Sequence, residues 1–216
     1  MKIKSFIGGY DKNFSYLVWC EKTKHAAIVD ASVEPNEMIN YIIDQNLILK
    51  KILITHSHVD HVYFINDWID YINDLHIYSY DYKIKKSKCK TIQITNNDVI
   101  NIGNELITSL HTPGHYYDSI CFWNQSSKSI FTGDTIFVGR TGRVKSNRSN
   151  IADLYNSVYN ILFKLPEETI IYPGHHYGHM KKISFKDNKI ISDFFNCKSQ
   201  SEFINVMKIF EKNKNK

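Results

Sequence analysis

The chain has 216 residues and a formal net charge of +5, a length that suits one domain with a substantial core. Basic residues gather only in two short stretches, Lys83–Lys90 and Lys208–Lys216, and nothing in the sequence resembles a nucleic-acid-binding signature. We therefore expect no nucleic-acid partner. The mild basic excess could favour an anionic substrate, although a solvated surface explains it more simply.

The cysteine pattern and the N-terminal sequence bear on the compartment. Four cysteines lie far apart and form no CxxC pair, so a disulfide framework is not expected and a reducing compartment is the simpler interpretation. The N-terminal stretch lacks an apolar run of signal-peptide length, and no window approaches a membrane span. These observations predict a cytoplasmic protein without a membrane partner.

The predicted elements alternate between short strands and helices. In chain order they are strands at Ile3–Ile7, Phe14–Trp19 and His25–Val29, a helix from Pro35, strands at Lys51–Thr55, Leu75–Tyr80, Thr91–Ile94, Leu106–His111, Ser119–Trp123 and Ser129–Thr132, a helix at Ile151–Leu165 and a strand at Thr169–Tyr172. From about Gly178 the pattern is helical, and residues 211–216 are expected to fray. Strands mixed with helices favour a layered α/β fold.

The strongest motif is the heptapeptide THSHVDH, which follows a predicted strand. It places three histidines and one carboxylate within six residues: His56, His58, Asp60 and His61. Imidazole and carboxylate groups are ligands for zinc, iron or manganese. His56 and His58, two residues apart in an extended segment, can point the same way. An exposed, adventitious histidine-rich loop is the alternative, but the motif favours half of a two-metal site.

Three distant segments add one candidate ligand each. His115 ends the segment TPGH, Asp134 ends TGD, and His175 ends YPGH, and each segment follows a predicted strand. A glycine beside each candidate lets the backbone approach closely. Because all of these residues fall at strand ends, we expect one metal site built from His56, His58, Asp60, His61, His115, Asp134 and His175.

The set HxHxDH, TPGH, GD and PGH resembles the metallo-β-lactamase superfamily over roughly Phe6–Tyr177. The resemblance implies an α/β fold of the αββα sandwich type, with two mixed β-sheets flanked by helices. It implies a catalytic domain at 1–177 and a short C-terminal helical extension of the same domain at 178–216. It further implies two divalent metal ions, with zinc foremost and iron or manganese also fitting. The first would be held by His56, His58 and His115, the second by Asp60, His61 and His175, with Asp134 bridging both.

Within the superfamily, FTGDTIFVGRTGR and LPEETIIYPGHHYG are similar to glyoxalase II-type hydroxyacylglutathione hydrolases. This resemblance implies a metallo-hydrolase that cleaves thioesters such as S-lactoylglutathione by attack of a metal-bound hydroxide, with catalytic roles for Asp60 and Asp134. Arg143 and Tyr177 fall where these enzymes carry a lysine and a tyrosine that contact glutathione. Lys145 replaces a second tyrosine and completes the predicted substrate contacts. A glutathione-derived thioester is therefore the expected small-molecule partner.

Some positions depart from the hydrolase pattern and leave the acyl substrate open. Tyr63 and Phe64 replace small residues, and only about 40 residues follow Tyr177. The alternative function is that of a persulfide dioxygenase, whose resemblance implies one non-haem iron at His56, His115 and Asp134. Those enzymes usually carry cysteine and aspartate where this chain has Thr141 and Val144, which favours the hydrolase. A non-catalytic metal-binding paralogue is the third hypothesis, and the complete ligand set argues against it.

The remaining histidines, His25, His76, His111, His176 and His179, match no motif position and are expected to serve the surface or the core. Asp30 is expected to close a turn near the sheet edge, where it could also support a metal ligand. Cys121 lies on a predicted strand and is expected in the core.

Overall fold

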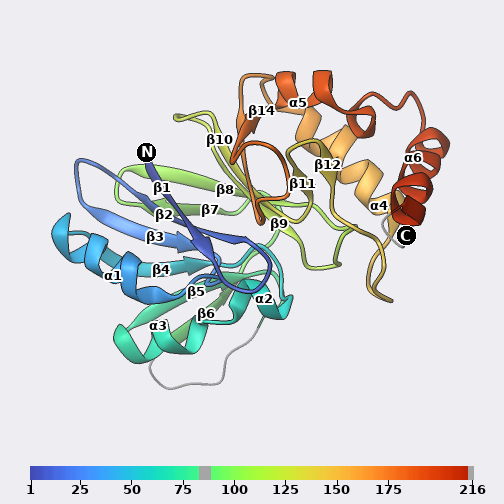
Figure 1. Cartoon of the computed structure of the whole chain (residues 1–216). Helices are drawn as coiled ribbons and strands as arrows, with labels where there is room; N and C mark the ends of the chain where they lie inside the picture. Colours follow the sequence, from blue (N-terminus) through green and yellow to red (C-terminus); the bar gives the residue numbers. More distant parts are fainter. Residues whose placement is uncertain (83–88, 214–216) are drawn as a thin grey trace.

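The computed structural model describes residues 1–82 and 89–213, and within them the strands form two large sheets and a small ribbon (Figure 1). The first sheet takes its strands in chain order: β1 (Lys2–Gly8), β2 (Asn13–Trp19), β3 (His25–Val29), β4 (Ile48–Leu53), β5 (Leu75–Ser79) and β6 (Cys89–Gln93). β1, β2 and β3 pair antiparallel, whereas β3 to β6 pair parallel. The sheet is therefore mixed.

The second sheet is built from the later part of the chain. Its strand order is β14 (Ile183–Ser184), β13 (Ile170–Pro173), β10 (Ser129–Gly133), β9 (Ile120–Asn124), β8 (Glu105–His111) and β7 (Val99–Ile102). Only β10 and β13 pair parallel in this sheet. The ribbon of β11 (Ile136–Phe137) and β12 (Arg140–Thr141) follows β10 directly.

The helices fall into two groups, one for each sheet (Figure 1). The first group is α1 (Pro35–Asp44), α2 (Val59–Val62) and α3 (Ile65–Tyr71), and the second is α4 (Ile151–Asn156), α5 (Phe185–Ile191) and α6 (Gln200–Asn213). Short helical turns η1 (Ser157–Ile161) and η2 (Leu162–Lys164) continue α4, and η3 (Asp193–Phe195) lies between α5 and α6.

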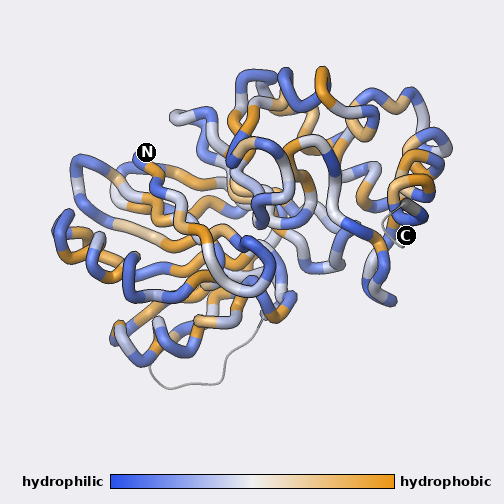
Figure 2. Tube along the Cα trace, in the orientation of Figure 1, coloured by the Kyte–Doolittle hydropathy of each residue, from blue (hydrophilic) through white to orange (hydrophobic). Residues whose placement is uncertain are grey.

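Three hydrophobic clusters show how these layers stack. Residues of the first sheet such as Ile28 pack with Met38 of α1 and Trp68 of α3. The facing sides of the two sheets pack together in a second cluster, and a third joins the second sheet to α4, α5 and α6. The strands of both sheets are accordingly rich in hydrophobic residues (Figure 2). The order of layers is helix, sheet, sheet, helix, which confirms the predicted αββα fold.

Local sequence explains where these elements lie. All seven residues of β2 are buried, as expected for a strand covered on both faces. Pro35 occupies the first turn of α1, where its missing N–H costs nothing, and Met38 and Ile42 face the core. Ile43, the next residue, is 58% exposed. The helical spacing places it one residue past the buried stripe.

Several predicted boundaries were wrong. The strand predicted at Lys51–Thr55 is β4, which ends at Leu53, and the strands β7, β11, β12 and β14 were not predicted. Three of these four have only two residues, too few for a hydrophobic period to be read. Residues 211–213 were expected to fray, but they continue α6.

The remaining expectations on the termini and basic stretches lie partly outside the described residues. Of the stretch Lys83–Lys90, residues 83–88 fall outside, as do residues 214–216 of the C-terminal tail. Among the helices that are described, none combines the length and the apolar character that crossing a bilayer requires.

Candidate metal centre

The histidine-rich motif lies in the connection from β4 to α2, at the edge where the two sheets meet. Its backbone is fixed from both sides. The Thr55 carbonyl accepts a hydrogen bond from Ile120 N of the second sheet at 2.7 Å, and His61 N donates to the His58 carbonyl at 3.0 Å to start the helical turn. The strand, the link to the other sheet and the short helix together aim four side chains at one point.

The second sheet supplies three more side chains at the same edge. His115 lies beyond the end of β8, Asp134 directly follows β10, and His175 follows β13. Gly174 N donates to the Gly133 carbonyl at 2.8 Å, and its own carbonyl accepts from Phe14 N at 2.8 Å. These bonds hold the strand ends and the β1–β2 turn around one centre. All seven predicted ligands therefore converge, and we call them the donor cluster.

Three imidazole nitrogens of the donor cluster face one another. His58 Nδ1 lies 3.0 Å from His56 Nε2 and 3.1 Å from His115 Nε2. A ring nitrogen either carries a proton or offers a lone pair, so three of them cannot all satisfy each other. A cation bound between the three nitrogens would satisfy all of their lone pairs. Three histidine nitrogens are a common zinc ligand set.

A second group of donor atoms lies beside the first. His175 Nε2 is 3.2 Å from Asp60 Oδ2 and 3.3 Å from His61 Nε2, and all three ligand atoms lie within 4.8 Å of one another. The group combines two imidazoles with one carboxylate, a donor set that zinc, iron and manganese accept. This second group could therefore hold a second ion.

Asp134 lies between the two groups. Its Oδ1 is 3.2 Å from His61 Nε2 and 3.4 Å from His175 Nε2, and its Oδ2 is 3.6 Å from His115 Nε2. Oδ1 is buried, and no described residue gives it a hydrogen bond of normal geometry. A buried, unsatisfied carboxylate oxygen is costly unless a cation faces it. The donor cluster therefore fits divalent metal ions.

The outward-facing nitrogens of the histidines are held by the surrounding chain. His115 Nδ1 donates to the Arg143 carbonyl at 2.8 Å, and His175 Nδ1 donates to the Asp11 carbonyl at 2.9 Å. Because these carbonyls can only accept, the Nδ1 atoms carry protons, and the Nε2 atoms point into the cluster. Metal-binding histidines are usually oriented in this way.

Two further polar residues support the cluster. Asp30 Oδ2 lies 2.8 Å from His61 Nδ1 and also accepts from the Thr55 hydroxyl at 2.8 Å, so it supports a candidate ligand as the sequence suggested. Asn13 Nδ2 donates to Asp60 Oδ2 at 2.9 Å. Sequence patterns did not predict the contacts made by Asp11 and Asn13, because the β1–β2 turn and the start of β2 carry no candidate ligand of their own.

Burial and neighbouring charge set the protonation of these groups. Burial lowers the pKa of His56 well below its usual value and that of His58 to about 4, so both imidazoles are neutral and can offer lone pairs. Burial by itself would raise the pKa of Asp134, but the charges of His175 and His61 hold it well below the ordinary range. Burial by itself would lower the pKa of His61 and His175, but the neighbouring carboxylates raise both, that of His175 to about 9. The cluster therefore presents neutral imidazole at His56 and His58 and an ionised carboxylate at Asp134.

Close packing explains a glycine in the PGH motif. A Cβ atom on Gly174 would lie 2.5 Å from Asp134 Oδ1 and 2.7 Å from His61 Cε1. Any larger residue would therefore push two candidate ligands out of place. This is the close backbone approach that the glycine beside His175 predicted.

Of the three predicted substrate contacts, Tyr177 and Arg143 touch ligands of the donor cluster, and Lys145 lies two residues beyond Arg143. Tyr177 stacks on the His175 ring at 4.7 Å between centroids, and its hydroxyl donates to Asp11 Oδ2 at 2.5 Å. Arg143 and Lys145 follow β12, and the backbone carbonyl of Arg143 is already bonded to His115.

Arg140, which was not predicted, is only 8% exposed, and its guanidinium lies 4.2 Å above the Tyr177 ring. We call Arg140, Arg143 and Lys145 the cationic rim.

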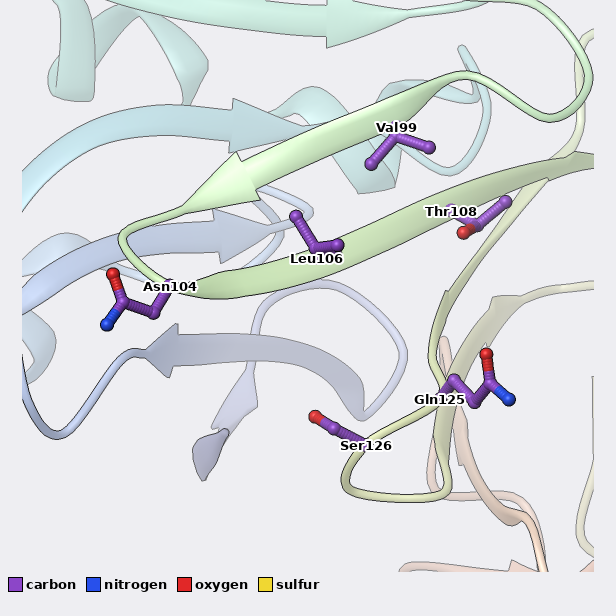
Figure 3. Close-up of a pocket in the computed structure, with 6 residues that line it drawn as sticks. All are labelled: Val99, Asn104, Leu106, Thr108, Gln125 and Ser126. Atoms are coloured by element: carbon purple, nitrogen blue, oxygen red, sulfur yellow. The ribbon is translucent and has the colours of Figure 1, made fainter.

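Two surface hollows differ in their relation to this centre. A hollow of about 220 Å³ adjoins Asp60 and is lined by Tyr10, Tyr63 and Phe64. Tyr63 and Phe64 are the bulky residues that stand where the hydrolases carry small ones. A larger hollow of about 500 Å³ lies over β7, β8 and the β9–β10 turn (Figure 3). No donor-cluster residue lines the larger hollow, and its side chains are apolar or neutral, so it offers no ligands or acid–base groups.

Comparison with known proteins agrees with this geometry. Residues 8–175 match the family model of the metallo-beta-lactamase superfamily. The chain is 32% identical to the hydroxyacylglutathione hydrolase of Dictyostelium discoideum, over 93% of this chain and 78% of that protein. It is 28% identical to the probable polyketide biosynthesis zinc-dependent hydrolase BaeB of Bacillus velezensis, over 89% and 86%.

A solved structure gives the same answer at the level of the fold. The crystal structure of ETHE1 from Myxococcus xanthus superposes with a TM-score of 0.85 and 27% identity, covering 96% of this chain and 90% of that one. This match covers more of the chain than the family model, which spans residues 8–175. The fold, the convergent donor cluster and these relatives lead to one conclusion: the chain belongs to the metallo-beta-lactamase superfamily.

Proposed function

We propose that this protein is a metallo-hydrolase of the glyoxalase II type that cleaves glutathione thioesters such as S-lactoylglutathione. The observation that carries the proposal is the pair of adjacent donor groups with the Asp134 carboxylate between them. The relatives named hydroxyacylglutathione hydrolase, which align with most of this chain, support the same activity. Substrate class and reaction therefore follow from the site and the relatives together.

The donor cluster is proposed to hold two divalent ions, with zinc foremost. His56, His58 and His115 would hold one, Asp60, His61 and His175 would hold the other, and Asp134 would contact both. When bound, such a pair supplies Lewis acidity for the carbonyl oxygen and acidifies a water molecule so that it can attack at neutral pH. The relative named a zinc-dependent hydrolase supports the choice of zinc.

The two carboxylates are proposed to handle the proton. The Asp60 side chain is 30% exposed, whereas the Asp134 side chain is 11% exposed, so Asp60 can exchange protons with solvent more readily. Asn13 orients Asp60 through the bond to Oδ2. In the net reaction water adds to the thioester carbonyl, the carbon–sulfur bond breaks, and a carboxylate, a thiol and a proton are released. No side-chain nucleophile is needed.

The thiol portion of the substrate is proposed to bind along Arg143, Lys145 and Tyr177. Guanidinium and ammonium groups suit the carboxylates of glutathione, and the Tyr177 ring lies directly against His175. Tyr177 Oη is already held by Asp11, which fixes the ring beside the donor cluster. Residues 178–216 are proposed as a helical extension of the catalytic domain 1–177, because Phe185 and Phe203 share its hydrophobic cluster.

A metal analysis combined with two assays tests the proposal. We expect two metal ions per chain, and hydrolysis of S-lactoylglutathione without oxygen uptake. A single iron per chain, with oxygen consumed on glutathione persulfide, would instead support the dioxygenase. Thr141, which stands where the dioxygenases usually carry cysteine, is buried and donates to Met207 Sδ at 3.3 Å, a packing role that favours the hydrolase.

A further inference from the structure

A carboxylate of the protein itself occupies the position between two predicted substrate-binding cations. Glu211, near the end of α6, places Oε2 3.1 Å from Lys145 Nζ and 3.7 Å from Arg143 Nε. The Glu211 side chain is 20% exposed, so this ion pair is partly shielded from water. Any anionic group that reaches Arg143 and Lys145 therefore meets this carboxylate first.

The contact is not required to dock α6. Phe203 and Met207 of the same helix are almost fully buried in the cluster that α6 shares with the second sheet. Their burial stabilises the docked helix through apolar contact, at roughly 1.5–3 kcal/mol for each fully buried large side chain. An ion pair that is partly exposed adds far less. Apolar packing of α6 therefore places Glu211 beside the two cations, and the Glu211 charge is not needed to hold the helix in place.

We propose that Glu211 is a specificity-determining residue that competes with substrate carboxylates for Arg143 and Lys145. This inference rests on the proposed function, because it assigns these two cations to the thiol portion of the substrate. Glu211 thus already places one negative charge against these two cations. The site therefore discriminates against thiols with several carboxylates and favours thioesters whose thiol portion is neutral or carries one negative charge.

The test compares two substrates in the metal-loaded, full-length enzyme. Glu211→Gln removes the competing charge while keeping the size of the side chain. We expect KM for S-lactoylglutathione to fall roughly two- to fivefold, the range that a partly exposed ion pair represents, with kcat unchanged. KM for the lactoyl thioester of N-acetylcysteamine, whose thiol has no carboxylate, should not change. Glu37→Gln, the same substitution on the exposed side of α1, is the matched control and should alter neither KM.

A binding measurement gives a readout independent of turnover. S-methylglutathione keeps the glutathione carboxylates but has no free thiol to bind a metal, so calorimetric titration reports the cationic contacts. Its affinity should rise by the same two- to fivefold factor in Glu211→Gln. In Glu211→Asp the charge is drawn back by one methylene, so the affinity for S-methylglutathione should rise by a smaller factor. If the thermal midpoint shows that Glu211→Gln is unfolded, the Glu211→Asp variant tests the competition in its place.

The outcomes separate this inference from the proposed function. Suppose that the wild-type enzyme hydrolyses S-lactoylglutathione but the folded variants show an unchanged KM and an unchanged affinity for S-methylglutathione. This result would overturn the role of Glu211 and leave the proposed function standing. Absence of hydrolysis, with tighter S-methylglutathione binding in the variants, would overturn the function and keep the competition. An equal fall in KM for both thioesters would mean that Glu211 acts through structure and not through charge.

Discussion

The donor cluster and the cationic rim lie side by side but are held by different kinds of structure. The donor cluster sits at strand ends of two sheets, where backbone hydrogen bonds and close-packed glycines leave its side chains little freedom. Two members of the cationic rim, Arg143 and Lys145, lie on the connection after β12, and their side chains are 41% and 44% exposed. The chemistry is thus built on the rigid part of the fold, and the choice of substrate on the adaptable part.

The comparison predicts two classes of variant. Changes in the donor cluster should reduce metal content together with activity, whereas changes in the cationic rim should alter KM and leave metal content intact. A variant of one class that behaves like the other would show that the two regions are coupled.

The largest effect is expected from Asp134→Ala. The carboxylate lies between both donor groups, so its removal takes charge away from each proposed ion site. We expect activity to fall to the uncatalysed background and metal content to drop, measured by elemental analysis after dialysis. Full metal content with a wild-type rate would show that Asp134 does not contact both ions.

Gly174→Ala should come next. The added methyl group would overlap Asp134 Oδ1 and His61 Cε1, and it can be accommodated only if these ligands shift. Misplacing catalytic groups by about 1 Å can cost on the order of a hundredfold in rate, so we expect a loss of that order in kcat/KM. Gly8→Ala is the control, since the nearest atoms to its methyl group would be the ends of the Glu34 and Val33 side chains, away from the donor cluster. Equal losses in both variants would point to general destabilisation.

Asp30→Asn should act through His61. Asparagine tolerates the left-handed backbone of this position, where φ is 58°. Asp30 uses both carboxylate oxygens as acceptors: Oδ2 faces the His61 ring and the Thr55 hydroxyl, and Oδ1 accepts from Thr55 N at 2.8 Å. The asparagine amide has only one acceptor oxygen, so its NH2 group must face one of these donors. Loss of such a supporting contact typically weakens metal binding by roughly 10–100-fold. Competition with a chromogenic chelator measures the affinity for the metal ion. An unchanged affinity would show that Asp30 does not support metal binding through His61.

Arg143→Ala should have the smallest effect and should belong to the second class. A charge-assisted hydrogen bond to a substrate carboxylate is worth roughly 1.5–3 kcal/mol when shielded, but Arg143 is partly exposed and already faces Glu211. We therefore expect KM for S-lactoylglutathione to rise about three- to tenfold, with metal content unchanged and with little effect on a thioester lacking carboxylates. Equal losses on both substrates would indicate a structural role for Arg143.

The same contrast explains how far the sequence could be interpreted. Every member of the donor cluster lies in a short motif after a strand, so spacing and residue type were enough to predict the convergence of His56, Asp134 and His175. Glu211 lies in no such motif, and its place depends on how α6 packs against the second sheet. Arg140 lies within the segment FTGDTIFVGRTGR, but its position over the Tyr177 ring depends on tertiary packing. The contact of Asp11 with His175 passes through a backbone carbonyl, to which side-chain identity gives no clue.

The division of the strands has a consequence for engineering. Each sheet uses a continuous part of the chain, one ending with β6 and the other beginning with β7, and the donor cluster takes four residues from the first part and three from the second. A chain divided between Gln93 and Val99 would thus place an incomplete ligand set on each fragment. Metal retention and thioester cleavage would then report fragment complementation, appearing only when the two pieces reassemble.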